Sequence, residues 1–75
     1  MDIVVKLDTF EKIKDYIQMA YLYPGDIVAK SGQYVVDGKS LMGLISLNLS
    51  NPIILIFNDC VTHDDLINFN KFLAQ

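Results

Sequence analysis

The chain is poor in the residues that most often carry out chemistry. Among its 75 residues there are one cysteine, one histidine and no tryptophan. The single cysteine, Cys60, cannot form a disulfide within the chain, and one thiol in a sequence without a recognisable secretory signal is typical of the cytoplasm. No histidine or second cysteine has a spacing that would activate Cys60, so we expect a small, partly buried side chain there.

Positive charge and long apolar runs are also scarce. Six basic residues stand against nine acidic ones, the net charge is −3, and the basic residues form no cluster. Nucleic acid is therefore not an expected partner, because phosphate contacts supply most of the affinity there. The longest apolar run, Ile53 to Phe57, is far shorter than the roughly 18 residues of a membrane span. We expect a soluble, cytoplasmic protein that does not enter a membrane.

Metal-binding and catalytic motifs are not found. His63 stands directly ahead of Asp64 and Asp65, but adjacent residues at a helix start point in different directions, and no third ligand has a suitable spacing. His63 is therefore expected to be an exposed residue of a first helical turn. No phosphate-binding glycine loop or nucleophile motif occurs. We expect no metal, no cofactor, no catalytic residue and no enzymatic activity.

The composition predicts one folded domain over residues 1–75. Hydrophobic residues make up 52% of the chain and charged residues 20%, which is typical of a folded rather than a disordered segment. Apolar spacing and turn residues predict the elements. Strands are expected at 1–7, 26–30, 33–37 and 53–57, and helices at 9–21, at 40–47 and from 62 through Leu66, Phe69 and Leu73.

Capping and turn residues mark the ends of these elements. Asp8, with Glu11 three residues later, is predicted to cap the first helix, and Thr62, with Asp65, the last one. Ser31-Gly32 is predicted to form the hairpin turn. The tyrosines are expected at the edges of the core with their hydroxyls in water; they are Tyr16, Tyr21, Tyr23 and Tyr34.

The predicted order of elements is β-α-β-β-α-β-α. Its strands are too few and too interrupted for a doubly wound parallel sheet. A four-stranded antiparallel sheet with the helices on one face buries all the apolar stripes at once. We therefore predict an α+β fold, an open-faced β-sandwich.

Residues 38–47, GKSLMGLISL, combine a capping residue with an apolar surface. Ser40 is predicted to cap a two-turn helix, which places its hydroxyl beside unpaired backbone N–H groups. The same geometry would favour a phosphoryl group, and Met42, Gly43 and Ile45 would form an apolar surface around it. Residue types alone favour a plain cap over a modification site, because serine is a preferred cap in any helix.

This segment closely resembles the regulatory-serine segment of HPr, the histidine-containing phosphocarrier protein of the bacterial sugar phosphotransferase system, which commonly reads KSIMG before a short apolar stretch. The resemblance covers nearly the whole chain through the order of elements and an acidic pair near the start of the last helix. It implies the HPr-like fold. It also implies that Ser40 corresponds to the serine that a dedicated kinase phosphorylates in Gram-positive relatives. The residues beside that serine correspond to Lys39, Leu41, Met42 and Gly43.

The family's phosphoryl-accepting site is not matched. In HPr a loop like GxHARPA carries the accepting histidine, with an arginine two residues later. Here KLDTFEK puts Thr9 near the histidine position and Glu11 at the arginine position. A hydroxyl beside a negative charge is a poor nucleophile for phosphoryl transfer. The resemblance therefore implies a degenerate member, similar in logic to the catabolite-repression HPr-like regulators.

The expected function is that of a non-enzymatic regulatory or binding module. Its partner would be another protein, such as an HPr kinase or a transcriptional regulator, contacted around Ser40 through Lys39, Leu41, Met42, Gly43 and Ile45. Two alternatives stay open. One is an active phosphocarrier with a displaced acceptor, His63, and the other is a structural or interaction domain in which Ser40 is only a cap.

Overall fold

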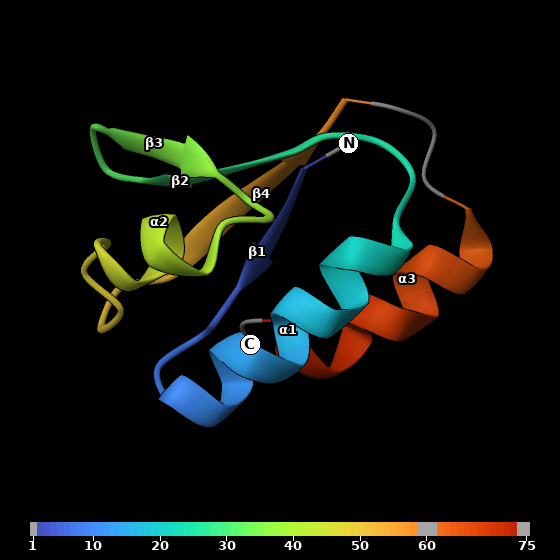
Figure 1. The fold of residues 1–75 in the computed structure, drawn as a ribbon, viewed down its shortest axis with the longest axis horizontal. Coiled ribbons are helices and arrows are strands. Elements are labelled where there is room, and N and C mark those ends of the chain that lie inside the picture. Colours follow the sequence, from blue (N-terminus) through green and yellow to red (C-terminus); the bar gives the residue numbers. More distant parts are fainter. Residues whose placement is uncertain (1, 59–61, 74–75) are drawn as a thin grey trace.

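The computed structural model describes residues 2–58 and 62–73, and its order of elements is the predicted one (Figure 1). The prediction for Cys60, and the part of the first predicted strand that falls on Met1, lie outside the described residues. The elements are β1 Asp2–Val5, α1 Phe10–Leu22, β2 Ile27–Ser31, β3 Tyr34–Asp37, α2 Leu41–Ile45, β4 Ile53–Phe57, α3 His63–Phe69 and a short 3-10 helix, η1, Asn70–Phe72.

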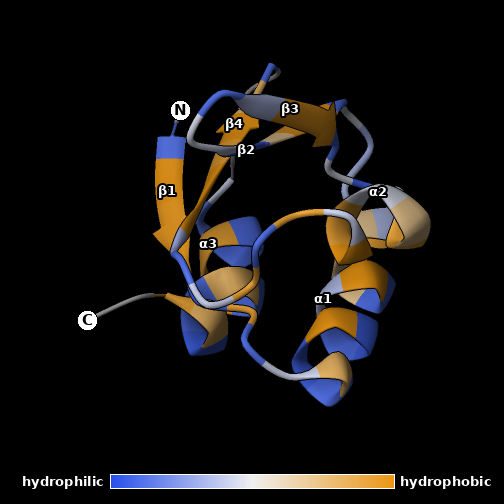
Figure 2. Ribbon diagram, turned by 90° about the vertical axis from the view of Figure 1, so that its left-hand side faces the viewer, coloured by the Kyte–Doolittle hydropathy of each residue, from blue (hydrophilic) through white to orange (hydrophobic). Residues whose placement is uncertain are grey.

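The four strands form one antiparallel sheet in the order β1-β4-β2-β3. Figure 2 shows α1, α2 and α3 on one side of this sheet and, within residues 2–58 and 62–73, no layer on the other. The predicted α+β open-faced sandwich, with helices on one face, is confirmed. Strand β4 lies between β1 and β2, and its residues alternate between buried and at least partly exposed positions although all five are apolar.

The core lies between the sheet and the helices. Side chains alternate along a strand, so every second residue points to the helices, and Ile53, Leu55 and Phe57 of β4 are buried in this way. Aromatic rings fill the space beneath α1 and α3, with neighbouring ring centroids 5.2 to 5.9 Å apart. These rings belong to Tyr16, Tyr23, Phe57, Phe69 and Phe72.

Several predicted element ends are shifted by one or a few residues. The first strand stops at Val5 rather than Leu7, and α2 covers Leu41–Ile45 rather than 40–47. The hairpin loop is Gly32-Gln33, because Ser31 already pairs with Tyr34 in the sheet; Gly32 has φ +59°, which glycine adopts without strain. The last α-helix does not reach Leu73, since α3 tightens into η1 after Phe69 and Leu73 pairs with Val5.

The predicted cap of α1 is wrong, whereas that of α3 is confirmed. Thr9, not Asp8, is the N-cap of α1: its backbone is extended and its side chain accepts a hydrogen bond from the N–H of Lys12. Asp8 lies one residue too early for that geometry and binds the Lys12 ammonium instead. Thr62 and Asp65 form the predicted reciprocal capping box at α3.

The tyrosines divide into two pairs rather than sharing the core edge. Tyr16 and Tyr23 are buried, at 0% and 1% exposure, whereas Tyr21 and Tyr34 are 69% and 73% exposed. The Tyr16 hydroxyl does not reach water but donates to the backbone carbonyl of Gly38. Among the described residues, none of the helices is long and apolar enough to cross a membrane.

Candidate functional site on helix α2

Ser40 is the N-cap of α2, as predicted. Its backbone is extended, with φ −101° and ψ 116°, and its Oγ accepts a hydrogen bond from the N–H of Gly43 at 3.1 Å. Its carbonyl accepts the N–H of Leu44 at 3.0 Å. Ser40 is only partly buried, so the residue caps the short helix and still lies at the surface.

Gly43 lies where α2 packs closely against β3. A Cβ on Gly43 would lie 3.2 Å from the Cβ of Val36 and 3.3 Å from both the Cβ and the Oγ of Ser40. An alanine at this position would therefore press on β3 and on the capping serine by a few tenths of an ångström. The Met-Gly pair of the sequence has a packing reason at this position.

The outer side of α2 is apolar and exposed. Met42 is 76% exposed and Ile45, three residues on, is 42% exposed, and residues three apart share one face of a helix. Leu41 is partly buried against the core, and Leu44 is completely buried. Helix α2 therefore uses Leu44 as its anchor and leaves Met42 and Ile45 in water beside Ser40.

A polar joint holds the start of α2 against α1. The carboxylate of Asp37 accepts the N–H of Lys39 at 2.9 Å, and the Asp37 carbonyl accepts the N–H of Ser40 at 3.1 Å. The Lys39 ammonium donates to the carbonyl of Tyr23 at 2.6 Å and lies 5.7 Å from the centre of the Tyr23 ring. Lys39 is half-buried, so its ammonium is engaged within the fold, unlike the side chains of Met42 and Ile45.

The role of Asp37 was missed from the sequence, although a signal was present. An aspartate whose side chain accepts the backbone N–H two residues later forms an Asx turn, and Asp37-Gly38-Lys39 has that spacing. The partner of Lys39 had no such signal, because the Tyr23 carbonyl comes from a distant part of the chain.

A second contact fixes the same joint from below. The buried Tyr16 hydroxyl donates to the Gly38 carbonyl at 2.8 Å, and the N–H of Gly38 donates to the Ile27 carbonyl at 2.7 Å. Burial, and secondarily the Asp37 carboxylate, raises the pKa of Tyr16, so the phenol stays protonated as a donor. Gly38, two residues before the cap of α2, is thus hydrogen-bonded to both α1 and β2.

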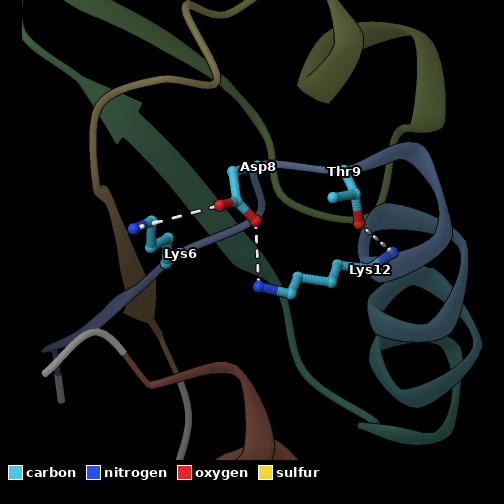
Figure 3. A network of polar contacts seen from close by, with 4 residues as sticks. All are labelled: Lys6, Asp8, Thr9 and Lys12. Carbon is cyan, nitrogen blue, oxygen red and sulfur yellow. Dashed lines mark hydrogen bonds and ion pairs between the residues drawn. The ribbon is translucent and has the colours of Figure 1, made fainter.

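Thr9, which the resemblance to HPr puts near the histidine position, is an exposed helix cap. Its Oγ1 accepts the N–H of Lys12 at 3.2 Å (Figure 3). The adjacent Asp8 carboxylate accepts the Lys12 ammonium at 2.9 Å and lies 3.9 Å from that of Lys6. The Lys12 hydrogen bond is the largest effect on the Asp8 carboxyl and lowers its pKa.

These contacts leave Thr9 without activation. A hydroxyl becomes a useful nucleophile when a neighbouring base removes its proton, and a carboxylate with a lowered pKa is a weaker base. The two lysines share the Asp8 carboxylate, so part of their positive charge is already offset before it could balance a phosphoryl group. Glu11, in the first turn of α1, adds a further negative charge.

His63 lies on another element and is exposed at the first position of α3. The predicted exposed position is confirmed. Among residues 2–58 and 62–73, no group of three or more histidine, cysteine, aspartate and glutamate side chains could hold a metal ion.

Four antiparallel strands in the order β1-β4-β2-β3, covered on one face by helices, define an open-faced sandwich of the HPr type. No protein-family model and no curated protein matches the sequence. Among solved structures, HPr-C-His from Thermoanaerobacter tengcongensis superposes with a TM-score of 0.77 at 17% identity, covering 95% of this chain and 88% of that one. The phosphocarrier protein HPr from Bacillus anthracis str. Ames superposes with a TM-score of 0.67 at 18% identity, covering 99% and 94%. The chain has the HPr-like fold.

Replacing the cap tests the local role of Ser40. We expect Ser40→Ala to lower the free energy of unfolding by about 1 kcal/mol, because the Gly43 N–H loses its acceptor. Ser46→Ala is the matched control at the other end of α2, where the hydroxyl donates to the Gly43 carbonyl from an exposed position, and it should cost less than about 0.5 kcal/mol. Urea denaturation of both variants gives the comparison; equal costs would contradict the capping role.

Proposed function

We propose that the protein is a regulatory or binding module of HPr-like fold that does not relay phosphate. It acts by binding another protein through the α2 surface, defined as Ser40, Leu41, Met42, Gly43 and Ile45, with Lys39 holding the surface in place. It is not an enzyme, needs no cofactor and works in the cytoplasm. Phosphorylation of Ser40 by an HPr kinase switches the surface.

The observation that carries the proposal is the exposure of Met42 and Ile45 beside a partly exposed Ser40. Methionine is a flexible, polarizable side chain that is over-used at protein-binding surfaces. A dianionic phosphoryl group on Ser40 would add charge at the edge of this apolar patch and change which partner it fits. The likeness of GKSLMGLISL to the regulatory-serine segment of HPr supports the choice of serine.

The absence of relay activity is supported by the start of α1. A phosphocarrier needs an imidazole nucleophile and a cation beside it, whereas this chain has Thr9 as a cap and Glu11 two residues on. Asp8 offsets part of the positive charge of Lys6 and Lys12. Threonine at this position is suited to holding the helix rather than to accepting phosphate.

Incubation with an HPr kinase and ATP tests the switch. We expect one phosphate on Ser40, located by mass spectrometry, with none on Ser40→Ala and an unchanged yield on Ser46→Ala. An authentic HPr, incubated in parallel, shows that the kinase is active. No phosphate on Ser40 under conditions that modify that HPr would remove the switch.

The same reaction tests the binding surface. Met42→Glu should slow phosphorylation about tenfold, because a few residues near the centre of an interface carry most of its binding energy and the change places a charge on the most exposed apolar residue of α2. Ile67→Glu is the matched control, because Ile67 is also exposed, at 58%, but lies on α3. Equal rates for the two variants would contradict recognition through α2.

Phosphoenolpyruvate and the first enzyme of the phosphotransferase system test relay activity. We expect no acid-labile phosphohistidine on this chain under conditions that label an HPr fully. A label on His63 would overturn the proposal in favour of a carrier with a displaced acceptor. His63→Gln is the control for label carried by residual first enzyme. The substitution would abolish a label on His63 but not one on the contaminating enzyme.

A further inference from the structure

The sheet face opposite the helices carries an aliphatic patch. Along each strand the residues that alternate with the core point to this face, and Val4, Val35 and Ile54 are 44%, 57% and 40% exposed there. Val28 and Ile56 are partly exposed on the same face. In the part of the chain that the structure describes, no element covers this face (Figure 2).

The strand register arranges this outer face in two rows. One row runs Asp2, Ile56, Val28, Asp37 across β1, β4, β2 and β3, and the other runs Val4, Ile54, Lys30, Val35. Five aliphatic side chains thus adjoin one another. Lys30 lies within the patch, and the two aspartates lie at opposite edges of it.

We propose that this outer face packs against the same face of a second copy of the chain, forming a weak dimer of two stacked sheets. Face-to-face packing about 10 Å apart, with strands nearly aligned, is the usual way in which two antiparallel sheets bury their faces. A second copy is the occupant that the charges favour, because the face is complementary to itself.

That complementarity selects one of the two symmetric arrangements. When the two-fold axis runs across the strands, each strand lies over the same strand of the second copy, and each row of one copy faces the other row of its partner. Lys30 then covers Val28 of the second copy, beside Asp37 of the second copy, which neighbours Val28 in the sheet. With the axis along the strands, Asp2 would instead face Asp37 and Lys30 would face Ile54, opposing like charges and burying a cation without a partner.

The size of the face sets the strength of the contact. Four strands at the usual spacing of about 4.8 Å are roughly 19 Å across. Such a patch buries on the order of 500 Å² per copy, which is below the roughly 800 Å² per partner of a standard stable interface. The dimer is therefore expected to form only at high protein concentration. It leaves both α2 surfaces outside, on the two helical layers.

Sedimentation equilibrium from about 10 μM to about 1 mM protein tests the proposal, since small interfaces associate weakly. The mean mass should rise toward twice that of the chain. Amide shifts recorded over the same dilution should change at the outer-face residues Val4, Val28, Lys30, Val35, Ile54 and Ile56. A chain that stays monomeric at the highest concentration would overturn the proposal, as would shifts centred on α2 or on α1.

A charge reversal distinguishes this dimer from non-specific association. Lys30→Glu should weaken association about tenfold or more, because residue 30 then lies diagonally next to Asp37 of the second copy with a like charge. Lys14→Glu makes the same change of charge on an exposed position of α1, on the helical layer, and should weaken it far less. Equal weakening would overturn the proposed face. The kinase reaction tests the α2 surface on the helical layer, so its result is independent of the association measured here.

Discussion

Gly38→Ala is expected to destabilise the protein by about 3 kcal/mol, the upper part of the range for overpacked sites. A Cβ at this position would lie 2.5 Å from the Cγ2 of Ile27 and 2.9 Å from its Cβ and its carbonyl oxygen. The obstacle is partly backbone, and β2 cannot withdraw because it is hydrogen-bonded between β4 and β3. In a domain of this size the melting temperature should fall by more than about 10 °C.

The same substitution at Gly32 is the matched control. Gly32 has no atom within 4 Å of an added Cβ, but its φ is +59°, so an alanine there should cost only the left-handed backbone, about 1 to 2 kcal/mol. The two variants separate steric overlap from backbone strain. If thermal unfolding gave equal losses for both, close packing of Gly38 against β2 would be refuted.

The loss at Gly38 should also reach the proposed binding surface. Gly38 connects β3 to the cap of α2. Its N–H donates to the Ile27 carbonyl, and its carbonyl accepts the Tyr16 hydroxyl. Displacing it moves Lys39 and Ser40, which follow directly in the chain. The kinase reaction on folded Gly38→Ala at low temperature should therefore be slower, whereas Gly32→Ala should react at the normal rate.

Local patterns in the sequence predicted the elements and two of the three α-helix caps. Residues 53–57 are a continuous apolar run, which predicts a strand, and Ser40 and Thr62 each precede a helix in the position of an N-cap. Such signals depend on neighbours within one turn of a helix. The cap of α1 was assigned one residue too early, because Asp8 and Thr9 are both good capping residues and only the backbone decides between them.

The contacts that position the site could not be predicted in the same way. Tyr16 meets Gly38, and Lys39 meets Tyr23, across separations of 22 and 16 residues. No local pattern reports such pairs, since they exist only when α1 and the β3-α2 turn have been brought together by the core. Tyr16 was accordingly expected to reach water, and Lys39 to be one more residue around Ser40.

The outer face of the sheet illustrates a related difficulty. Strand β3 has the exposed Val35 directly before Val36, which packs against the core, so hydropathy alone does not tell which side is covered. Only the register with β2 assigns Val35 to the open face, opposite Lys30. An aliphatic face left open is therefore visible in the fold and not in the pattern of residues.

Raising the pH above about 10, the ordinary pKa of tyrosine, is expected to destabilise the protein through Tyr16. The phenol is buried, and burial raises its pKa above the ordinary value of 10.0, while the unfolded chain keeps that ordinary value. The stabilisation is thus fully present below pH 10 and is lost as the pH rises from 10 toward the raised pKa. In that window the unfolded state has released a proton that the folded state keeps, so the free energy of unfolding should fall by up to about 1.4 kcal/mol per pH unit.

Tyr16→Phe should change both the level and the slope of this dependence. At neutral pH the variant should be about 1 to 2 kcal/mol less stable, because the buried Gly38 carbonyl loses its donor. Above pH 10 its stability should fall less steeply than that of the unchanged protein, so the difference shrinks and then reverses about one pH unit higher. Tyr34→Phe, at a ring 73% exposed, is the control and should follow the unchanged protein throughout. Urea unfolding between about pH 7 and pH 11.5 gives the three curves, and parallel curves for Tyr16→Phe and the unchanged protein would show that the Tyr16 phenol does not hold the joint beneath α2.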